Sequence, residues 1–449
     1  MRSLRRSCAV LQLLCAFGSI GWIARSAGAE DGPIIEITPG DERAFHIAVQ
    51  RFRDDLLPAR PERGERLLEA IEQALDFNGV LLPLDRAAFL GPETTAELDA
   101  GRRYDCPDWS QGGANALLEG VIGGGGGEIE VTYQVWDTAR CVRLLRGRLV
   151  RPASEIRRLG AALADDVVKA FTGTRGVADT EIAFISTRSG HREVYVMDAE
   201  GRNARSATKS AEIKAFPAWL PHGDGILYTT YTTSGFPDVF VSSRSKARAG
   251  RILRNVLPQA PKYRGVFAPD GEYLALVASV AGAADIFLVD RSLSKVERLT
   301  NNKDVIDIAP AWSPDGQQIA FVSDRAGTPQ IYIMDRDGSN PRRITYQSSY
   351  SATPAWSPDG RWIAYGVRAE GQFDLYLIDP TGEMNVPLIA HRGNDQYPSW
   401  SPDGRKVVFS SDRHGRADLY VIDVNSRLLQ RLTQDARENL APAWGPFPE

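Results

Sequence analysis

The sequence has few of the residues on which most metal and nucleophilic chemistry depends. It contains only four cysteines, five histidines and four methionines in 449 residues. No histidine lies in an HExxH motif or beside a cysteine pair at zinc-ligand spacing, and there is no GxSxG motif. These absences argue against a zinc enzyme, a zinc-binding module and a serine hydrolase. The histidines are His46, His191, His222, His391 and His414.

Long apolar runs are also missing. An apolar run at residues 8–23 follows a basic start, contains two glycines and is short for a bilayer span. An A-x-A sequence at residues 27–29 follows it, which predicts a cleaved secretory signal peptide over residues 1–29. The alternatives are a membrane anchor, which the short interrupted run disfavours, and lipidation of Cys15, whose preceding residues match a lipoprotein motif poorly.

The chain lacks a basic cluster. Removing the four arginines of residues 1–29 leaves 49 basic against 57 acidic residues, a formal charge of −8. We therefore expect neither nucleic acid nor an anionic membrane surface to be the main partner. Only Cys106 and Cys141 remain after this segment. In an oxidising compartment they either form a disulfide or stay two separate buried thiols.

Residues 30–176 predict a small α/β domain, a mixed sheet with helices on one face. A run of five glycines at 123–127 precedes a strand and has no Lys-Ser/Thr pair after it. It therefore predicts a flexible hairpin loop rather than a phosphate-binding loop. The expected elements are strands at 45–52, 80–84, 114–122, 128–136 and 141–150, a helix from Pro61 to Asn78, and a helix from an N-cap at Ser154 to Phe171.

The rest of the chain, residues 177–449, is dominated by a repeat. The phrase PAWSPDG occurs at residues 310–316 and 354–360, and PSWSPDG occurs at residues 398–404. Each unit of about 44 residues predicts four short strands, which is the pattern of a β-propeller blade. The aromatic residue of the phrase recurs at Trp219, Phe267, Trp312, Trp356, Trp400 and Trp444.

The units predict a six-bladed, WD40-like propeller that closes across its ends. Nothing like PAWSPDG precedes the strand at Ile182, and no further strand follows Trp444. We therefore predict that the Trp444 strand completes the blade that begins at Ile182, which pairs edges that an open sheet would leave bare. The repeated aromatic residues are interpreted as packing between and within blades.

Alternating strand directions separate two faces of the ring. The SPDG turns lie on one face, here the turn face, and the Ser-Asp-Arg loops and the connections between blades lie on the other, here the loop face. The loop face varies from unit to unit, so binding is expected there. Its candidate residues are Arg188, Tyr263, Asp304, Asp307, Arg325, Tyr350, Asp395, Tyr397 and Arg413.

Some of these candidates have alternative interpretations. The arginines of the Ser-Asp-Arg loops are expected to cover a neighbouring blade, with a ligand contact as the alternative. Asp304, Asp307 and Asp395 are either turn residues or a cation site at the mouth of the central tunnel.

Taken together, the chain resembles the TolB family, the periplasmic component of the Tol–Pal envelope system. The junction before the first blade, residues 163–176, is the most specific match, whereas peptidase and sugar-lyase propellers share WSPDG repeats. The second of the six repeated phrases departs from the family pattern, with Phe267-Ala268 in place of Trp-Ser. The other matching segments are residues 27–29, 34–40 with Ile47 and Phe52, 83–86 and 131–137.

The resemblance implies a monomeric, cofactor-free docking protein of the periplasm without catalytic residues. Such a protein would link the inner-membrane protein TolA, through an N-terminal arm at residues 30–40, to the outer-membrane lipoprotein Pal, through the propeller. This link would serve outer-membrane integrity and envelope constriction at division. The arm residues implied are Ile34, Ile35, Ile37 and Gly40, while Asp31 and Pro33 depart from the family pattern. The alternatives are a periplasmic propeller enzyme of the lyase or peptidase type and a propeller that senses a small molecule or cation.

Overall fold

The structure is a computed structural model of the chain, and it describes residues 45–56, 60–95, 106–232, 236–243, 246–251, 253, 255–280, 282–369 and 371–448. The predicted signal peptide (residues 1–29) and arm (residues 30–40), with Ile34, Ile35, Ile37 and Gly40, lie outside the described residues. Among the residues described, no helix is long and apolar enough to cross a membrane.

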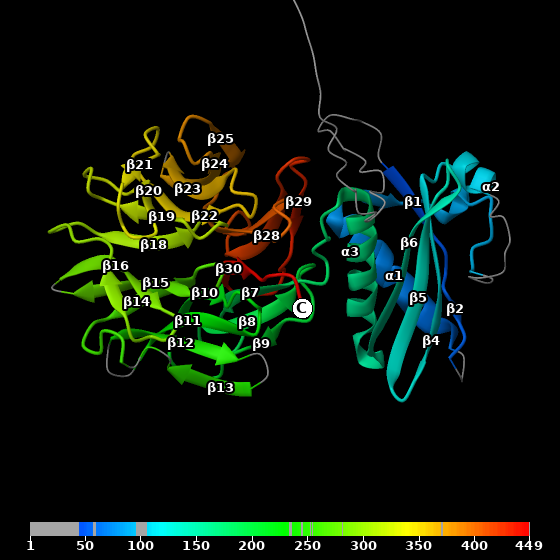
Figure 1. Cartoon of the computed structure of the whole chain (residues 1–449), viewed down its shortest axis with the longest axis horizontal. Coiled ribbons are helices and arrows are strands. Elements are labelled where there is room, and N and C mark those ends of the chain that lie inside the picture. Colours follow the sequence, from blue (N-terminus) through cyan, green and yellow to red (C-terminus); the bar gives the residue numbers. More distant parts are fainter. Residues whose placement is uncertain are drawn as a thin grey trace, which may run out of the picture. The chain divides into compact units, whose positions relative to one another are not determined.

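The first domain is a mixed sheet covered by two long helices on one face (Figure 1). The strand order is β3-β1-β4-β5-β6, and β2 pairs with β4. The strands are β1 (Phe45–Val49), β2 (Arg53–Asp54), β3 (Leu81–Pro83), β4 (Ala116–Gly125), β5 (Glu128–Asp137) and β6 (Val142–Pro152). The helices are α1 (Pro61–Asn78), α2 (Cys106–Gln111) and α3 (Ile156–Thr172), with the 3-10 turns η1 (Arg86–Ala88) and η2 (Ala153–Glu155).

Helix α2 corrects the prediction that all helices cover one face. Ile47 and Val49 of β1 belong to the core under α1 and α3, whereas Ala48 packs with Trp109 of α2. Successive side chains of a strand point to opposite faces, so α2 covers the second face. Of the two alternatives for the cysteines, the structure has the disulfide, which joins Cys106 of α2 to Cys141 with 5.7 Å between the Cα atoms.

The ends of the long helices follow the sequence only in part. Gly79 and Gly173 end α1 and α3 in left-handed conformations, with φ of 71° and 77°, as glycine allows. The prediction that Ser154 caps the N-terminus of α3 is wrong. Ser154 lies inside η2, and α3 begins at Ile156 without a side-chain cap. The glycine run forms a shorter loop than expected, because Gly125 still pairs with Glu128 across the β4–β5 hairpin.

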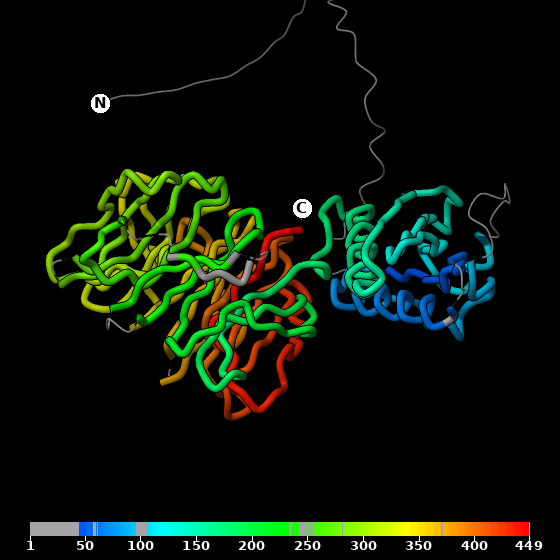
Figure 2. The backbone as a smooth tube through the Cα atoms, turned by 90° about the horizontal axis from the view of Figure 1, so that it is seen from below, coloured from blue at the N-terminus to red at the C-terminus, as the bar shows by residue number. Residues whose placement is uncertain are grey.

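The second domain is the predicted six-bladed propeller, and each blade is a four-stranded antiparallel sheet (Figure 1). The closing blade has the order β30-β7-β8-β9, so the prediction that the Trp444 strand completes it is confirmed. Figure 2 shows the last, red part of the chain beside the green first blade.

The blades consist of β7 (Glu181–Ser186), β8 (Glu193–Asp198), β9 (Arg205–Ser206) and β30 (Asn439–Trp444); β10 (Lys214–Trp219), β11 (Gly225–Tyr231), β12 (Pro237–Ser243) and β13 (Lys246–Arg251); β14 (Lys262–Phe267), β15 (Tyr273–Val280), β16 (Ala283–Asp290) and β17 (Val296–Arg298); β18 (Asp307–Trp312), β19 (Gln318–Ser323), β20 (Gln330–Asp335) and β21 (Arg342–Arg343); β22 (Ser351–Trp356), β23 (Ile363–Ala369), β24 (Gln372–Ile378) and β25 (Asn385–Ile389); β26 (Asp395–Trp400), β27 (Lys406–Ser411), β28 (Asp418–Asp423) and β29 (Leu429–Arg431).

Residues of the repeated phrase form hydrogen bonds within turns and between neighbouring blades. In the turn after Trp312, an Asp315 carboxylate oxygen accepts from the Ser313 hydroxyl at 2.6 Å and from the Gln317 amide at 3.0 Å. Between blades, the indole Nε1 of Trp400 donates to the Ala355 carbonyl at 2.9 Å. Trp312 and Trp400 also belong to hydrophobic clusters that join two blades, so the interpretation of the tryptophans as packing residues between blades is confirmed for them. The Asp315 turn is held by its own side chains.

Candidate binding site on the loop face of the propeller

A β-bulge interrupts the first strand of every blade. The pairing of that strand with the second shifts, for example between Ile308 and Ala311 of β18 and between Gln396 and Ser399 of β26. In five blades, one bulged residue precedes proline and has a left-handed backbone, with φ between 47° and 57°. The six corresponding positions, here the bulge ring, are Phe216, Arg264, Ala309, Thr353, Tyr397 and Ala441.

The repeated proline explains where the bulge forms. Proline donates no backbone hydrogen bond, so it is tolerated where the ladder is already broken. It also disfavours the right-handed helical conformation in the residue before it. Gly265 replaces this proline after Arg264, the exception in the ring. Bulges redirect side chains, and five of the six ring positions, all except Ala441, line one central cavity. In β14 the unpaired residue is Tyr263, which also lines the cavity, whereas Arg264 pairs with Val277.

This cavity, here the axial cavity, has a volume of about 430 Å³ and takes its lining from five of the six blades. Its walls come from the starts of first strands, the ends of second strands and the starts of third strands, which lie on the loop face. Tyr350 and Phe373 meet edge to face in one wall, with 5.6 Å between ring centroids. The aromatic lining residues are Phe216, Tyr231, Tyr263, Tyr350, Phe373 and Tyr397.

Arg264 is the charged residue of this lining. Its guanidinium carbon lies 5.7 Å from the centroid of the Phe216 ring. Within the part of the chain that the structure describes, this half-buried side chain makes no ion pair and no hydrogen bond. Burial lowers the pKa of Arg264, an effect that Tyr397 opposes. The cavity is thus mainly apolar, with several aromatic side chains and one positive charge in its lining.

The predicted loop arginines do not enter the cavity. Arg325 pairs with Asp307 at 3.0 Å, and its guanidinium lies over the rings of Phe321 and Tyr332 in the same blade. The expectation that these arginines cover a neighbouring blade is therefore wrong for Arg325. Arg413 does the same in its own blade, pairing with Asp395 at 2.8 Å and lying over Phe409 and Tyr420.

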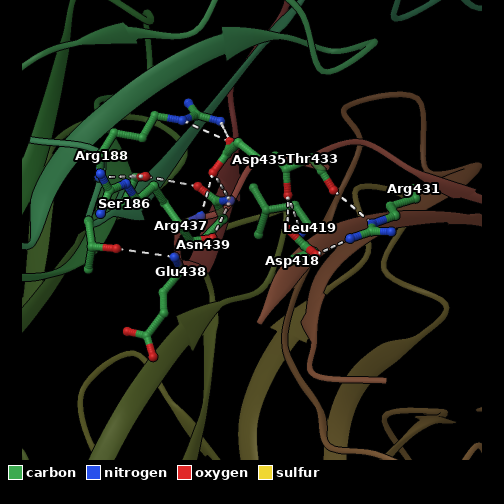
Figure 3. Close-up of polar contacts among 11 residues, drawn as sticks. Ser186, Arg188, Asp418, Leu419, Arg431, Thr433, Asp435, Arg437, Glu438 and Asn439 are labelled. Atoms are coloured by element: carbon green, nitrogen blue, oxygen red, sulfur yellow. Dashed lines mark hydrogen bonds and ion pairs between the residues drawn. The ribbon is translucent and has the colours of Figure 1, made fainter. Parts of the chain in front are cut away.

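Arg188 has the corresponding position in the closing blade. Its Nε donates to Asp435 at 3.0 Å (Figure 3). Its guanidinium also lies over the rings of Phe184 and Tyr195. Nearby, the Ser186 hydroxyl donates to Asn439 at 2.9 Å. These contacts join the start of the propeller to its end, which is a structural role.

The predicted carboxylates do not form a cation site in the described residues. Asp307 and Asp395 are fully buried and paired with arginines. Burial raises the pKa of Asp395, and hydrogen bonds from Ser411 and Arg413 act in the opposite direction. Asp304 lies exposed in the loop before β18. Over the described ranges, no group of three or more histidine, cysteine or acidic residues could hold a metal ion.

Three predicted residues, Tyr263, Tyr350 and Tyr397, do come together in the axial cavity. Sequence reasoning missed Phe216, Tyr231, Arg264 and Phe373. For Phe216 and Arg264 a signal exists, since comparing the six repeats shows one variable position directly before the Pro-Ala-Trp segment. Tyr231 and Phe373 lie at strand ends whose place in the ring only the structure gives.

Exposed apolar side chains also occur on the loop face. Tyr231 ends β11, Phe236 precedes β12, and Ile213 and Ile306 precede the first strands of their blades. Their exposed fractions run from 41% for Tyr231 to 62% for Phe236. Large exposed apolar residues near a cavity are typical of protein interaction surfaces.

The comparisons with known proteins agree with this architecture. A family model described as "TolB beta propeller domain" matches residues 168–448, and one described as "TolB amino-terminal domain" matches residues 33–144. "Tol-Pal system protein TolB" from Desulfosudis oleivorans is 33% identical over 239 residues, 52% of each chain. The protein of that name from one strain of Anaeromyxobacter dehalogenans is 32% identical over 314 residues, 69% of this chain and 68% of the relative.

A solved structure extends the likeness. The crystal structure of TolB from Acinetobacter baumannii superimposes with a TM-score of 0.74 at 25% identity, covering 90% of this chain and 98% of that one. The chain spans about half the length of the first curated relative it matches. Because the propeller model alone matches more than half of the residues, the chain belongs to the TolB family.

Proposed function

We propose that this protein is a non-catalytic, periplasmic docking component of a Tol–Pal system. Its arm, residues 30–40, binds a TolA-like inner-membrane protein, and the loop face of its propeller binds a Pal-like outer-membrane lipoprotein. The link serves outer-membrane integrity and envelope constriction at division. The proposal is supported by the family and by the names of the relatives.

The observation that carries the docking site is the axial cavity with exposed apolar residues beside it. Tyr231 both lines the cavity and is 41% exposed, so the cavity and the surface are continuous. Aromatic anchors near the centre of an interface commonly dominate its binding energy. We therefore assign Tyr263, Tyr350 and Tyr397 to the lipoprotein contact and give Arg188, Asp307, Arg325, Asp395 and Arg413 supporting roles within the blades.

The composition of the cavity favours docking over catalysis. Its described lining contains no histidine, cysteine, lysine or carboxylate, so no acid–base pair converges there. A lyase or peptidase would need such a pair, or a metal ion, within reach of the substrate. This favours a binding function over the enzymatic alternative.

Quantitative binding of the mature protein to the Pal-like lipoprotein encoded in the same organism tests the loop face. We expect Tyr397→Ala to raise Kd by about 10-fold or more, as truncation of an interface anchor does. Tyr273→Ala is the matched control: Tyr273 is also half-buried, but it begins β15 beside a turn-face loop. Equal loss from both variants would contradict the assignment of the face.

The arm is tested separately. Deleting residues 30–40 should abolish capture of a TolA-like protein and leave lipoprotein binding intact. A strand-like arm binds by adding to a sheet edge, so the deletion removes the backbone hydrogen bonds as well as the isoleucines. Persistent capture of TolA after deletion would show that the arm is not the site. Cell fractionation and N-terminal sequencing of the mature protein test export and cleavage after Ala29.

A further inference from the structure

Among the residues that the structure describes, none supplies a counter-charge to the positive charge of the axial cavity. Lys262 lies two residues before Arg264, but it is almost fully buried and pairs with Asp238 at 3.2 Å. The acidic residues that begin two other first strands, Asp307 of β18 and Asp395 of β26, pair with Arg325 and Arg413. Each of these carboxylates is therefore already bound to another cation, and within the described ranges the side chain of Arg264 contacts the Phe216 ring but no charged partner.

A half-buried guanidinium in a mainly apolar site has lost part of its hydration without gaining a charged partner among the described residues. Moving a charged group away from water without a partner is unfavourable, and one cation–π contact offsets only part of the cost. Burial accordingly lowers the pKa of Arg264. A carboxylate that enters the cavity would supply the missing partner, because the planar guanidinium can bind it with two parallel hydrogen bonds.

The cavity has the size and walls of a small-molecule site. Its volume of about 430 Å³ is within the usual range for ligand pockets. Part of the wall is built from second strands, at Val277, Val322 and Gly366, so the cavity extends into the ring instead of resting on loops alone. Edge-to-face rings such as Tyr350 and Phe373 suit a planar apolar body.

We propose that the axial cavity binds a small organic carboxylate with a planar apolar body. Its carboxylate pairs with Arg264, and its body lies among Phe216, Tyr350 and Tyr397. This site goes beyond the docking function, but it shares Tyr350 and Tyr397 with the lipoprotein contact proposed above, so ligand and lipoprotein would compete for these side chains. It also replaces the idea of a cation in the tunnel, because the charge of the lining is positive.

Calorimetric titration of the mature protein tests the charge requirement with three probes of one shape. These are 3-phenylpropionate, the neutral 3-phenylpropanamide and the cationic 3-phenylpropylamine. We expect one saturable site for the carboxylate, binding weaker by about 10-fold or more for the amide, and none for the amine. The proposal is overturned if the carboxylate does not bind at millimolar concentration, or if the amide or the amine binds as tightly.

Variants of Arg264 test whether this residue binds the carboxylate. Arg264→Gln should weaken 3-phenylpropionate binding by about 10-fold or more, and Arg264→Lys should retain part of the affinity because it keeps the charge. Arg336→Gln is the matched control, since Arg336 also lies over an aromatic ring, Tyr273 at 5.2 Å. Thermal unfolding shows whether each variant is folded. Unchanged affinity in a folded Arg264→Gln protein would overturn the proposal.

Lipoprotein binding, measured without probe, separates this proposal from the docking function. If Arg264→Gln weakens lipoprotein binding while 3-phenylpropionate fails to bind the unaltered protein, the carboxylate comes from the partner and the small-molecule site is wrong. If the probe binds through Arg264 and the lipoprotein does not bind at all, the ligand site stands and the docking assignment fails.

Discussion

Arg188 and Asp435 lie 247 positions apart in the sequence and form an ion pair across the closing blade. Asp435 belongs to the segment that leads into β30, and Arg188 follows β7, so the pair joins the end of the ring to its start (Figure 3). The guanidinium also lies over Phe184 and Tyr195, with centroid distances of 5.2 and 5.6 Å. This contact adds a side-chain link to the backbone pairing of β30 with β7.

The first prediction concerns this link. Arg188→Ala should lower the free energy of unfolding by about 1–2 kcal/mol, because it removes a partly buried ion pair and two ring contacts. Arg291→Ala removes an exposed pair with Glu272 inside one blade and should cost less than about 0.5 kcal/mol. Urea unfolding of both variants is the measurement. A similar decrease in the free energy of unfolding for both would show that the closing pair stabilises the protein no more than an exposed pair does.

Much of the propeller could be predicted because its information is periodic. The regular spacing of the tryptophans gives the blade size, and the unmatched Trp444 gives the closing strand. Both follow from sequence alone, since each repeat must bury its apolar strands against its neighbours. The same reasoning placed Tyr263, Tyr350 and Tyr397 on the loop face, because strand direction fixes the face.

The cavity could not be predicted, because it depends on how far each residue lies from the ring axis. Asp307 and Arg325 are 18 positions apart, yet the antiparallel pairing of β18 with β19 brings them together. As separate charges in variable loops they suggested a ligand site, whereas in three dimensions they neutralise each other. Arg264 was missed for the opposite reason: its significance is the lack of such a partner.

The second prediction tests the strain in the bulges. Ala441 has φ of 47° directly before Pro442. Residues with a Cβ atom adopt this left-handed conformation only at a cost in free energy. Ala441→Gly should therefore raise the free energy of unfolding by about 0.5–1 kcal/mol, after the extra chain entropy of glycine is counted. Ala443→Gly in the same strand β30 should lower it by a similar amount. Equal destabilisation by both variants would argue against strain at the bulge.

The third prediction concerns the disulfide between α2 and the end of the β5–β6 turn. Cys106 and Cys141 are 35 positions apart. Closing a loop of this length lowers the entropy of the unfolded chain and so raises its free energy by about 3–4 kcal/mol. A reductant should therefore lower the Tm of the oxidised protein. The Cys106→Ala, Cys141→Ala double variant should have the lower Tm without reductant and should not respond to it. A response of the double variant would mean that the reductant acts elsewhere.

The fourth prediction is a pH dependence that originates at Glu119 of β4. Its side chain is fully buried, and one of its oxygens accepts from Gln134 at 2.5 Å and from the indole of Trp136 at 2.9 Å. Burial raises the pKa of Glu119 from 4.5 to about 7, although both hydrogen bonds act to lower it. The folded protein therefore holds this proton at pH values where the unfolded chain has released it.

Stability should consequently fall as pH rises from the unfolded pKa through the folded one, a window of about pH 4.5 to 7. Glu119→Gln keeps an oxygen that can accept both hydrogen bonds but cannot ionise. We expect this variant to be more stable than the unaltered protein at pH 8 by about 2 kcal/mol, and to differ little at pH 4.5. Urea unfolding at both pH values measures the difference.

Glu130→Gln, on the exposed side of β5 where Glu130 pairs with Arg148, is the control and should not gain stability at pH 8. If Glu119→Gln shows the same difference from the unaltered protein at both pH values, Glu119 is not the group that titrates.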